Sequence, residues 1–318
     1  MNYRIYFSSL LSLLFVHFSF SQGIQKPGFV FKPNDQGIQL FENGKPVFFY
    51  QEKTKILADQ YKVNNYLHPL YSLTGDTLTE ESPKDHPYHR GVFWGWHQHY
   101  IDNKSIGEGW VFEGIYQEVE NVRTKTDKGN ARFDLSVLWK SSLYQNGKPY
   151  IEEKTNIIVF PAEQNIRIID FEISLRSLVP GVQIGGADDE KGYGGFCPRV
   201  KLPDGLVFTS ANGPVIPQNT QIKAGPWMDL SGAYGKNGEI SGVTILCHNS
   251  TPNYPAPWIL RQKASMQNVV FPGRERVSVP MDKPIVLRYR LIIHNGNASG
   301  VDLSKIQSEY NKMYSNQK

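Results

Sequence analysis

Imidazole, carboxylate and guanidinium groups gather in one stretch of the sequence, between Asp85 and His99. Four of the eight histidines lie here, namely His86, His89, His97 and His99. An imidazole can move a proton near neutral pH, which makes His86, His89 and His97 candidate catalytic residues. Arg90 follows His89 directly and could hold an anionic group through a forked contact.

Two other interpretations of this stretch stay open. His86 and His89, together with His97 or His99, could bind a metal ion, because imidazole is a common metal ligand. Alternatively, the stretch is a polar loop beside core residues, since clustered ionisable groups favour a site without proving one.

Aromatic side chains accompany these histidines. Trp94 and Trp96 alternate along a predicted strand that begins at Val92 or Phe93, so they would share one face. On that face they could offer stacking surfaces to a sugar. His97 and His99 would then share the opposite face.

A second polar segment, Asp188–Arg199, is rich in glycine. Gly192, Gly194 and Gly195 would let a loop pass close to a ligand, although the order of residues is not that of a phosphate-binding loop. Tyr193 could act as an acid or base if a neighbouring cation lowers its pKa. Arg199 could pair with a carboxylate or sulfate group. A glycine-rich crossover beside an acidic surface run is the structural alternative.

A third group lies between Cys247 and Arg261. His248 closes an apolar strand, Val243–Leu246, and strand ends often carry site residues. Trp258 is another candidate for stacking, and Arg261 another for binding an anion. A buried, hydrogen-bonded imidazole is an equally good interpretation of His248. Further candidates from an intervening segment are Glu108, Trp110 and Glu113.

Strands must position these residues, because period-two alternation dominates the sequence. Apolar residues alternate with polar ones over 133–139, 169–175 and 287–293, as in antiparallel strands with one wet face. Asn43-Gly44 and Asn146-Gly147 each predict a two-residue hairpin turn, the second joining Leu138–Tyr144 to Tyr150–Thr155. One helix is expected over Leu303–Tyr314, with Asp302 as its N-cap. The pattern predicts an all-β protein, a large antiparallel β-sandwich with a short C-terminal helix.

The N-terminus predicts export. Arg4 precedes an apolar run, Leu10–Phe20, and a small-x-small pattern ends at Ser21, which is typical of a signal peptide over residues 1–21. No later segment is long and apolar enough to cross a bilayer. We therefore expect one catalytic domain over residues 22–318, located in the periplasm or secreted. No basic stripe points to nucleic acid, and no oligomeric state follows from the sequence.

Two cysteines, Cys197 and Cys247, complete the inventory. We expect two buried free thiols, although export would also permit a disulfide. No cofactor and no metal ion are assigned.

The polar segments resemble the PmoA-like family of exported Bacteroidota proteins. The matching strings are Asp85–Gly91 with His97, Tyr193–Phe196 with Arg199, Trp227–Gly232, and Asn253–Trp258 with Arg261. The resemblance implies a sugar-mutarotase-like supersandwich and a role in polysaccharide degradation. The family label refers to methane oxygenation, but the sequence lacks the membrane spans that such an enzyme needs.

The chain also resembles the oligosaccharide dehydratase of ulvan-degrading marine bacteria. That resemblance implies a lyase that eliminates water from uronic-acid-containing oligosaccharides. The reaction needs a base for the C5 proton, a cation for the carboxylate and an acid for the departing hydroxyl. His89, His97 or Tyr193 could be the base, a second His or Tyr the acid, and Arg90 and Arg199 the cations.

Two alternatives remain. A glycoside hydrolase could use paired carboxylates such as Glu108, Glu113 or Asp188. A non-catalytic carbohydrate-binding sandwich would rely on tryptophans. On the leading hypothesis the catalytic residues are His86, His89, His97 and Tyr193, and the substrate, an anionic oligosaccharide, is bound by Arg90, Trp94, Trp96, Arg199, His248, Trp258 and Arg261.

Overall fold

The computed structural model describes Met1 and residues 28–314. The predicted signal peptide, residues 1–21, therefore lies outside the described residues apart from Met1. Within the described part, no helix has the length and apolar character that crossing a membrane would require.

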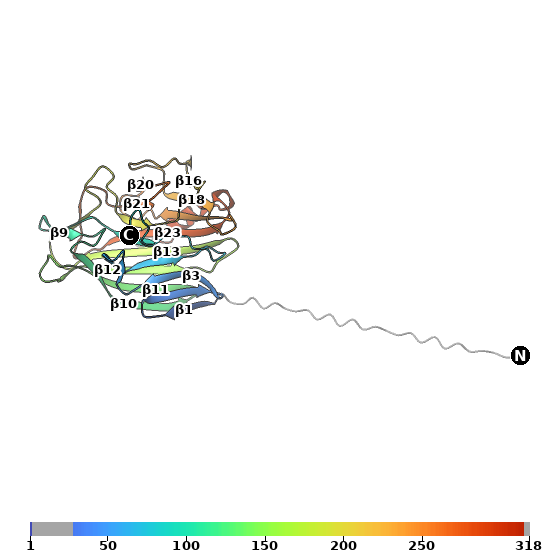
Figure 1. Ribbon diagram of the computed structural model, residues 1–318, viewed down its shortest axis with the longest axis horizontal. Coiled ribbons are helices and arrows are strands. Elements are labelled where there is room, and N and C mark those ends of the chain that lie inside the picture. Colours follow the sequence, from blue (N-terminus) through green and yellow to red (C-terminus); the bar gives the residue numbers. More distant parts are fainter. Residues whose placement is uncertain (2–27, 315–318) are drawn as a thin grey trace.

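Two large antiparallel sheets form the body of the molecule (Figure 1). The first has eight strands in the order β1 (Phe29–Pro33), β2 (Gly37–Glu42), β3 (Lys45–Gln51), β6 (Tyr66–Leu70), β7 (Val92–Gly95), β15 (Gly195–Pro198), β21 (Asn268–Val270) and β20 (Trp258–Ile259). The second has nine strands in the order β10 (Ile115–Asp127), β11 (Asn130–Ser141), β12 (Pro149–Val159), β13 (Ile166–Ser177), β23 (Ile285–Asn295), β19 (Ile240–Cys247), β18 (Trp227–Ala233), β16 (Val207–Ser210) and β17 (Gly213–Pro214).

The two sheets face each other across one hydrophobic core. Phe48 of β3 packs on Phe133 of β11 with ring centroids 5.3 Å apart, and Trp94 of β7 lies 6.4 Å from Phe171 of β13. The alternation predicted for residues 133–139, 169–175 and 287–293 falls within β11, β13 and β23. The predicted all-β sandwich is confirmed.

Turn chemistry explains the first hairpin. Asn43 and Gly44 join β2 to β3 with φ angles of 50° and 80°, as a two-residue turn of this hand requires. The second hairpin forms between β11 and β12, but its connection runs from Ser142 to Lys148. The prediction of a two-residue turn there was wrong, because β11 ends before Asn146 is reached.

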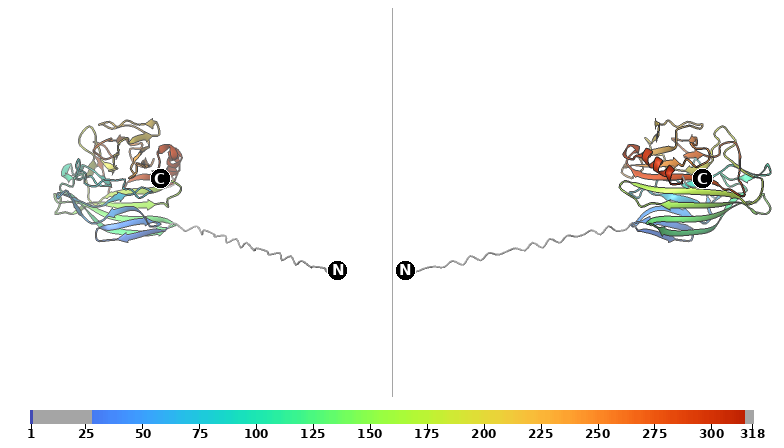
Figure 2. Two further views of the ribbon diagram at one scale, coloured as in Figure 1. Left: turned by 45° about the vertical axis from the view of Figure 1, so that its right-hand side comes forward. Right: turned by 180° about the vertical axis from the view of Figure 1, so that it is seen from behind.

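The C-terminal helix α1 covers Leu303–Lys312, two residues shorter than predicted at its end. The Asp302 carboxylate accepts a hydrogen bond from the backbone N–H of Lys305, which confirms the predicted N-cap. Leu303 and Tyr310 pack on Trp227, Leu246 and Ile292, so the helix covers the outer face of the nine-stranded sheet (Figure 2).

Two small sheets complete the fold. One has the order β22 (Val277–Ser278), β14 (Val182–Gly185), β8 (Gln98–Ile101) and β9 (Lys104–Glu108), and the other pairs β4 (Lys55–Leu57) with β5 (Tyr61–Val63). A short 3₁₀ turn covers Ala298–Gly300. Both cysteines are buried and free, so the expectation of two thiols is confirmed.

We predict that acid destabilises the fold through His99. Burial lowers the pKa of this imidazole to about 4, while the unfolded value is about 6.5. The unfolded state therefore binds a proton between these values and the folded state does not. Stability from this group is present above pH 6.5 and is lost as the pH falls towards 4, by about 3 kcal/mol.

Urea denaturation at a series of pH values measures this effect. His99→Gln should reduce the loss of unfolding free energy between pH 6.5 and 4 by about that amount. Tyr150→Phe removes the hydroxyl that lies 2.9 Å from His99 Nδ1 but keeps the imidazole. It should lower stability yet keep the acid slope. An unchanged slope in His99→Gln would contradict the prediction.

Candidate functional site

The site rests on the outer face of the eight-stranded sheet, where β7 and β15 pair. Trp94 and its partner Phe196 point into the sandwich core, whereas Phe93 and its partner Cys197 point the other way. Phe93 and Cys197 join Trp110 and other apolar side chains in a second, smaller core. The loops that carry the polar residues cover this second core.

The buried side chain of Arg199 connects these loops through hydrogen bonds. It follows β15 directly, and its side chain is 2% exposed. Its Nε donates to Glu80 at 2.9 Å, and one terminal nitrogen donates to Asp85 at 3.0 Å. The other terminal nitrogen lies 3.3 Å from Nδ1 of His89. One buried guanidinium thus fixes three side chains of the segment that precedes β7.

His89 is neutral in this setting. Burial, together with the charge of nearby Arg199, lowers its pKa to about 2. Because a guanidinium can only donate, Nδ1 of His89 accepts and its proton sits on Nε2. His89 therefore presents a fixed N–H donor, and the prediction that it could be the base is not supported by this tautomer.

Two other imidazoles each pair with a carboxylate through Nδ1. His86 Nδ1 lies 2.8 Å from Asp85, and His97 Nδ1 lies 2.9 Å from Glu108. A carboxylate at Nδ1 holds the proton there and leaves Nε2 free to accept one. This is the arrangement that orients an imidazole as a general base.

Both carboxylates stay charged. Partial burial raises the pKa of Asp85, but the hydrogen bond from His86 and the charge of Arg199 outweigh it, and the net pKa lies below the usual value. For Glu108, the hydrogen bond from His97 and the backbone N–H groups of Val111 and Trp110 likewise outweigh burial and lower the pKa.

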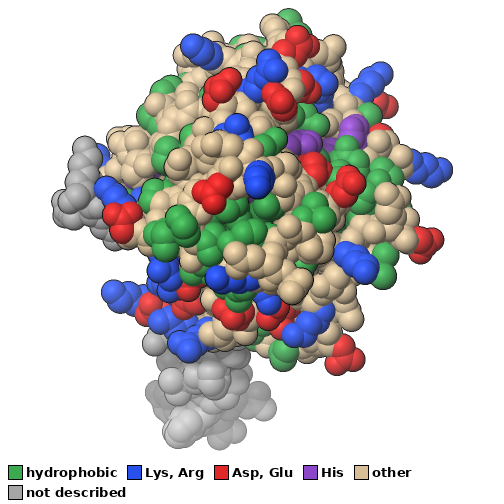
Figure 3. Space-filling model, turned by 90° about the vertical axis from the view of Figure 1, so that its left-hand side faces the viewer, with side chains coloured by type: hydrophobic (Ala, Val, Ile, Leu, Met, Phe, Trp, Pro, Cys, Tyr) green, Lys and Arg blue, Asp and Glu red, His purple; other side chains and the backbone are tan. Residues whose placement is uncertain are grey.

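Ring contacts join the imidazoles into one cluster. His86 stacks on His89 with centroids 4.6 Å apart and planes 5° apart. His89 lies 6.0 Å from Trp110, which stacks on His97 at 5.0 Å. Tyr193 meets His97 edge-on at 4.7 Å. Figure 3 shows histidine side chains close together at the surface, with carboxylates and hydrophobic groups around them.

A pocket of about 260 Å³ opens beside this cluster. Its lining residues include the rings of His86, Tyr88, His89 and Tyr193 and the cationic residues Lys191, Arg261 and Lys263. Arg261 is held in place by donating to the backbone oxygens of Gln218 and Asn219. The pocket therefore combines proton-transfer groups with positive charge, which suits an anionic ligand.

Both tyrosines of the pocket hold their protons. Burial, and then the proximity of Tyr88 and Asp189, raises the pKa of Tyr193 to about 12. Burial also raises the pKa of Tyr88. The condition under which Tyr193 was predicted to act as a base, a lowered pKa, is thus not met, and Tyr193 is a proton donor.

Gly91 lets the histidine segment approach the sheet. It has a φ angle of 45°, and a Cβ atom there would lie 1.9 Å from the backbone oxygen of Leu67. Any other residue would push the segment off β6.

The two arginines expected to bind the substrate lie beneath the pocket instead. Arg199 is occupied by Glu80, Asp85 and His89. Arg90 is 1% exposed, lies over the rings of Phe93 and Phe112, and donates to the backbone oxygen of Tyr88. Both therefore support the site, and the predicted direct contacts with an anion do not fit their burial.

The predicted stacking surfaces are also absent at Trp94, Trp96 and Trp258. These side chains are 1%, 1% and 0% exposed, and two of their indoles donate to backbone oxygens. Shared parity predicted a common face for Trp94 and Trp96 correctly, but that face is the one that packs into the core.

Two histidines lie elsewhere. His248 directly follows β19, but its Nε2 contacts the backbone oxygen of Tyr310, so it anchors α1 and does not reach the pocket. His99 lies in the core between Trp139 and Tyr150. The expectation that His97 and His99 share a face was wrong, because the chain leaves β7 after Gly95 and β8 starts only at Gln98.

The metal alternative finds little support in this geometry. The in-plane lone pairs of two stacked rings lie in nearly parallel, separated planes, so His86 and His89 do not direct theirs at one point. Among the described residues, no group of three or more His, Cys, Asp or Glu side chains is arranged to hold a metal ion.

Sequence reasoning missed Lys191 and Lys263 and underrated Glu108. Lys263 follows Arg261 by two residues, and Lys191 precedes Tyr193 by two, so proximity to predicted site residues was the available signal. Nothing in the spacing of Glu108 and His97 shows that the β9 turn brings them into contact.

Comparison with known protein families finds a match over most of the chain. The model of a family described as being of unknown function, DUF6807, matches residues 38–307. The match runs from β2 into α1 and includes every residue of the site. No curated protein matches the chain.

We predict that Arg199→Met destabilises the protein by about 2–3 kcal/mol, because buried hydrogen bonds to charged groups are lost together. Arg274→Met is the matched control. Arg274 pairs with Asp188 at 2.9 Å, but both side chains are exposed, so its loss should leave the free energy of unfolding nearly unchanged. Urea denaturation of the two variants measures the difference. Equal small losses would show that Arg199 does not organise the loops.

Proposed function

The chain belongs to the DUF6807 family of unknown function, and we propose that it is a lyase that eliminates water from uronic-acid-containing oligosaccharides. The proposal rests on one observation. A carboxylate-paired imidazole and a proton-holding tyrosine line the same pocket, and that pocket is rimmed by cations. The resemblance to PmoA-like proteins and to the ulvan oligosaccharide dehydratase stays a prediction, as does export to the periplasm.

His86 is the proposed base. Its Nδ1–H is directed at Asp85, so Nε2 is free to take the C5 proton of a uronate. The electron pair of the C5–H bond forms the C4–C5 double bond, and the C4–O bond breaks. Tyr193 gives its phenolic proton to the departing hydroxyl, which leaves as water.

The pKa of Tyr193 suits this role. A phenol with a pKa of about 12 still protonates hydroxide readily, because the pKa of water is about 16. His97, which pairs with Glu108, contacts the ring of Tyr193 edge-on and holds it in place. His97 is therefore a positioning residue in this mechanism.

Charge at the rim supports the choice of substrate. Removing a proton beside a carboxylate places a second negative charge on the sugar, which a nearby cation must offset. Lys191, Arg261 and Lys263 supply that charge, and the fixed Nε2–H of His89 can donate to a sugar oxygen.

Neither alternative function is favoured. A glycoside hydrolase needs two carboxyl groups at the pocket, but the described residues that line it include no Asp or Glu. Glu108 accepts from two backbone N–H groups and His97, and Asp188 binds Arg274 at the surface. The binding-only sandwich was expected to rely on Trp94, Trp96, Trp110 and Trp258, and none of these side chains is more than 1% exposed.

We predict that His86→Gln lowers kcat by about a hundredfold or more, because a general base is lost. The assay is incubation with uronate-containing oligosaccharides such as those from ulvan. Elimination creates a conjugated double bond, so ultraviolet absorbance rises and the product is lighter by one water. His99→Gln, which removes a core imidazole, should keep kcat near the wild-type value at pH 7.5. Saturated, shorter products from the wild type would rule out elimination.

We also predict that Lys263→Met raises KM for anionic oligosaccharides by about tenfold, because a contact with a charged group is lost. Binding of a neutral oligosaccharide of equal length should change little. Lys305→Met, which removes an exposed lysine on α1, is the control for net charge. Calorimetric titration checks the binding, and equal weakening for both sugars would remove the proposed role of Lys263.

A further inference from the structure

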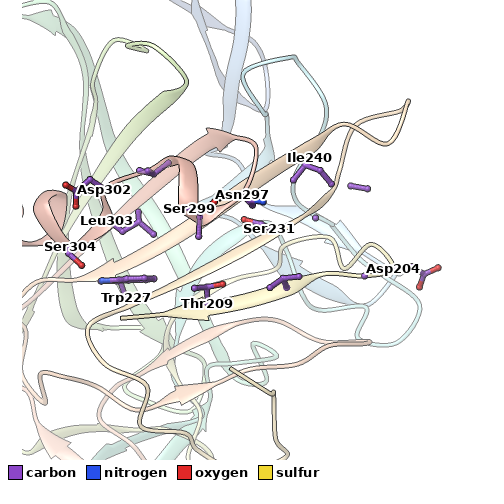
Figure 4. A pocket seen from close by; sticks show the side chains of 16 residues that line it. Asp204, Thr209, Trp227, Ser231, Ile240, Asn297, Ser299, Asp302, Leu303 and Ser304 are labelled. Carbon is purple, nitrogen blue, oxygen red and sulfur yellow. Dashed lines mark hydrogen bonds between the residues drawn. The ribbon is translucent and has the colours of Figure 1, made fainter. Parts of the chain in front are cut away.

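A second, larger cavity lies apart from the imidazole pocket. It is bounded by β16, β18, the start of β19 and the segment that leads into α1, and its volume is about 590 Å³. Figure 4 shows Trp227 and Thr209 on one side of it, with Ser299, Asp302 and Leu303 on the other. None of its lining residues belongs to the imidazole pocket.

One part of the wall is apolar. Trp227 lines the cavity with an indole that is 7% exposed, while Val207 and Ile240 at its rim are 52% and 46% exposed. An aromatic ring with aliphatic neighbours suits a ligand that presents C–H groups.

The rest of the wall is polar and mostly neutral. It carries the hydroxyls of Thr209, Ser231, Ser299 and Ser304, the amide of Asn297 and the carboxylates of Asp204 and Asp302. The described lining residues include no Lys or Arg. The charge is thus opposite in sign to that of the imidazole pocket, so an anionic ligand is disfavoured here.

Several of these groups are held so that they accept hydrogen bonds. The Ser231 hydroxyl donates to Asp229 at 2.5 Å, and Asp229 is fully buried and also contacts Thr244 and His294. The oxygen of Ser231, itself 5% exposed, therefore keeps its lone pairs for a ligand. The Ser299 hydroxyl donates its proton to Asn297, so its oxygen can likewise accept a hydrogen bond from a ligand.

We propose that this cavity binds a neutral sugar residue. The C–H face of the sugar packs on Trp227 and the aliphatic rim, and its hydroxyls form hydrogen bonds with Thr209, Ser231, Ser299 and Asp302. A polyol fits because the wall offers many oxygen acceptors, each suited to one O–H donor. The proposal is independent of the elimination reaction, since no residue is shared between the two cavities.

Saturation-transfer NMR with neutral methyl glycosides tests the proposal. Wild-type protein should transfer magnetisation to the C–H protons of the sugar, with binding in the millimolar range. Thr209→Val keeps the side-chain shape but removes a hydroxyl, and Trp227→Phe shrinks the aromatic wall. Each should weaken binding by about fivefold, the value of a lost hydrogen bond or contact. Melting temperatures confirm that both variants are folded.

Two controls locate the site. His86→Gln and Lys263→Met change the imidazole pocket and should leave neutral-sugar binding intact. Absence of transfer in the wild type, or transfer that these two variants abolish and Thr209→Val does not, would overturn the proposal. Stronger binding of an organic cation such as choline, which Asp302→Asn removes, would overturn it as well.

Discussion

One buried guanidinium holds the candidate site together. Arg199 leaves the sheet at the end of β15 and meets Glu80, Asp85 and His89, which lie far away in the sequence. Through Asp85 it fixes the orientation of His86, and through Nδ1 it fixes the tautomer of His89. A charge this deeply buried is tolerated because it is fully paired, and the same pairing gives the imidazoles their geometry.

The sandwich provides the platform for that arrangement. Alternation along β7 and β15 places Trp94 and Phe196 in the main core and Phe93 and Cys197 in a second core on the outer face. Loops that would otherwise lie over solvent therefore pack on an apolar floor. Burial on this floor lowers the pKa of His89 and raises that of Tyr193, which sets one as a neutral donor and the other as an acid.

Local sequence patterns predicted more of the fold than of the candidate site. The alternation of apolar and polar residues predicted β11, β13 and β23, and Asn43-Gly44 predicted the hairpin between β2 and β3, because these signals are local. The histidine cluster was also recognisable from composition. Strand alternation predicted that Trp94 and Trp96 lie on the same face, but it could not show that this face packs against the other sheet. The partners of Arg199 and Glu108 depend on contacts between distant segments, and no local pattern encodes them.

The two walls of the imidazole pocket differ in how freely their residues can change. On one wall, His86 and His89 are locked by Arg199, and Gly91 admits no side chain. On the other, Lys191 and Lys263 extend from loops, and it is the backbone oxygen of Lys191, not its ammonium group, that holds the Gln221 side chain. Over evolutionary time, the first wall is expected to stay constant while the second diverges. If the proposed elimination reaction is correct, related proteins would then share one chemistry and differ in the sugars that they accept.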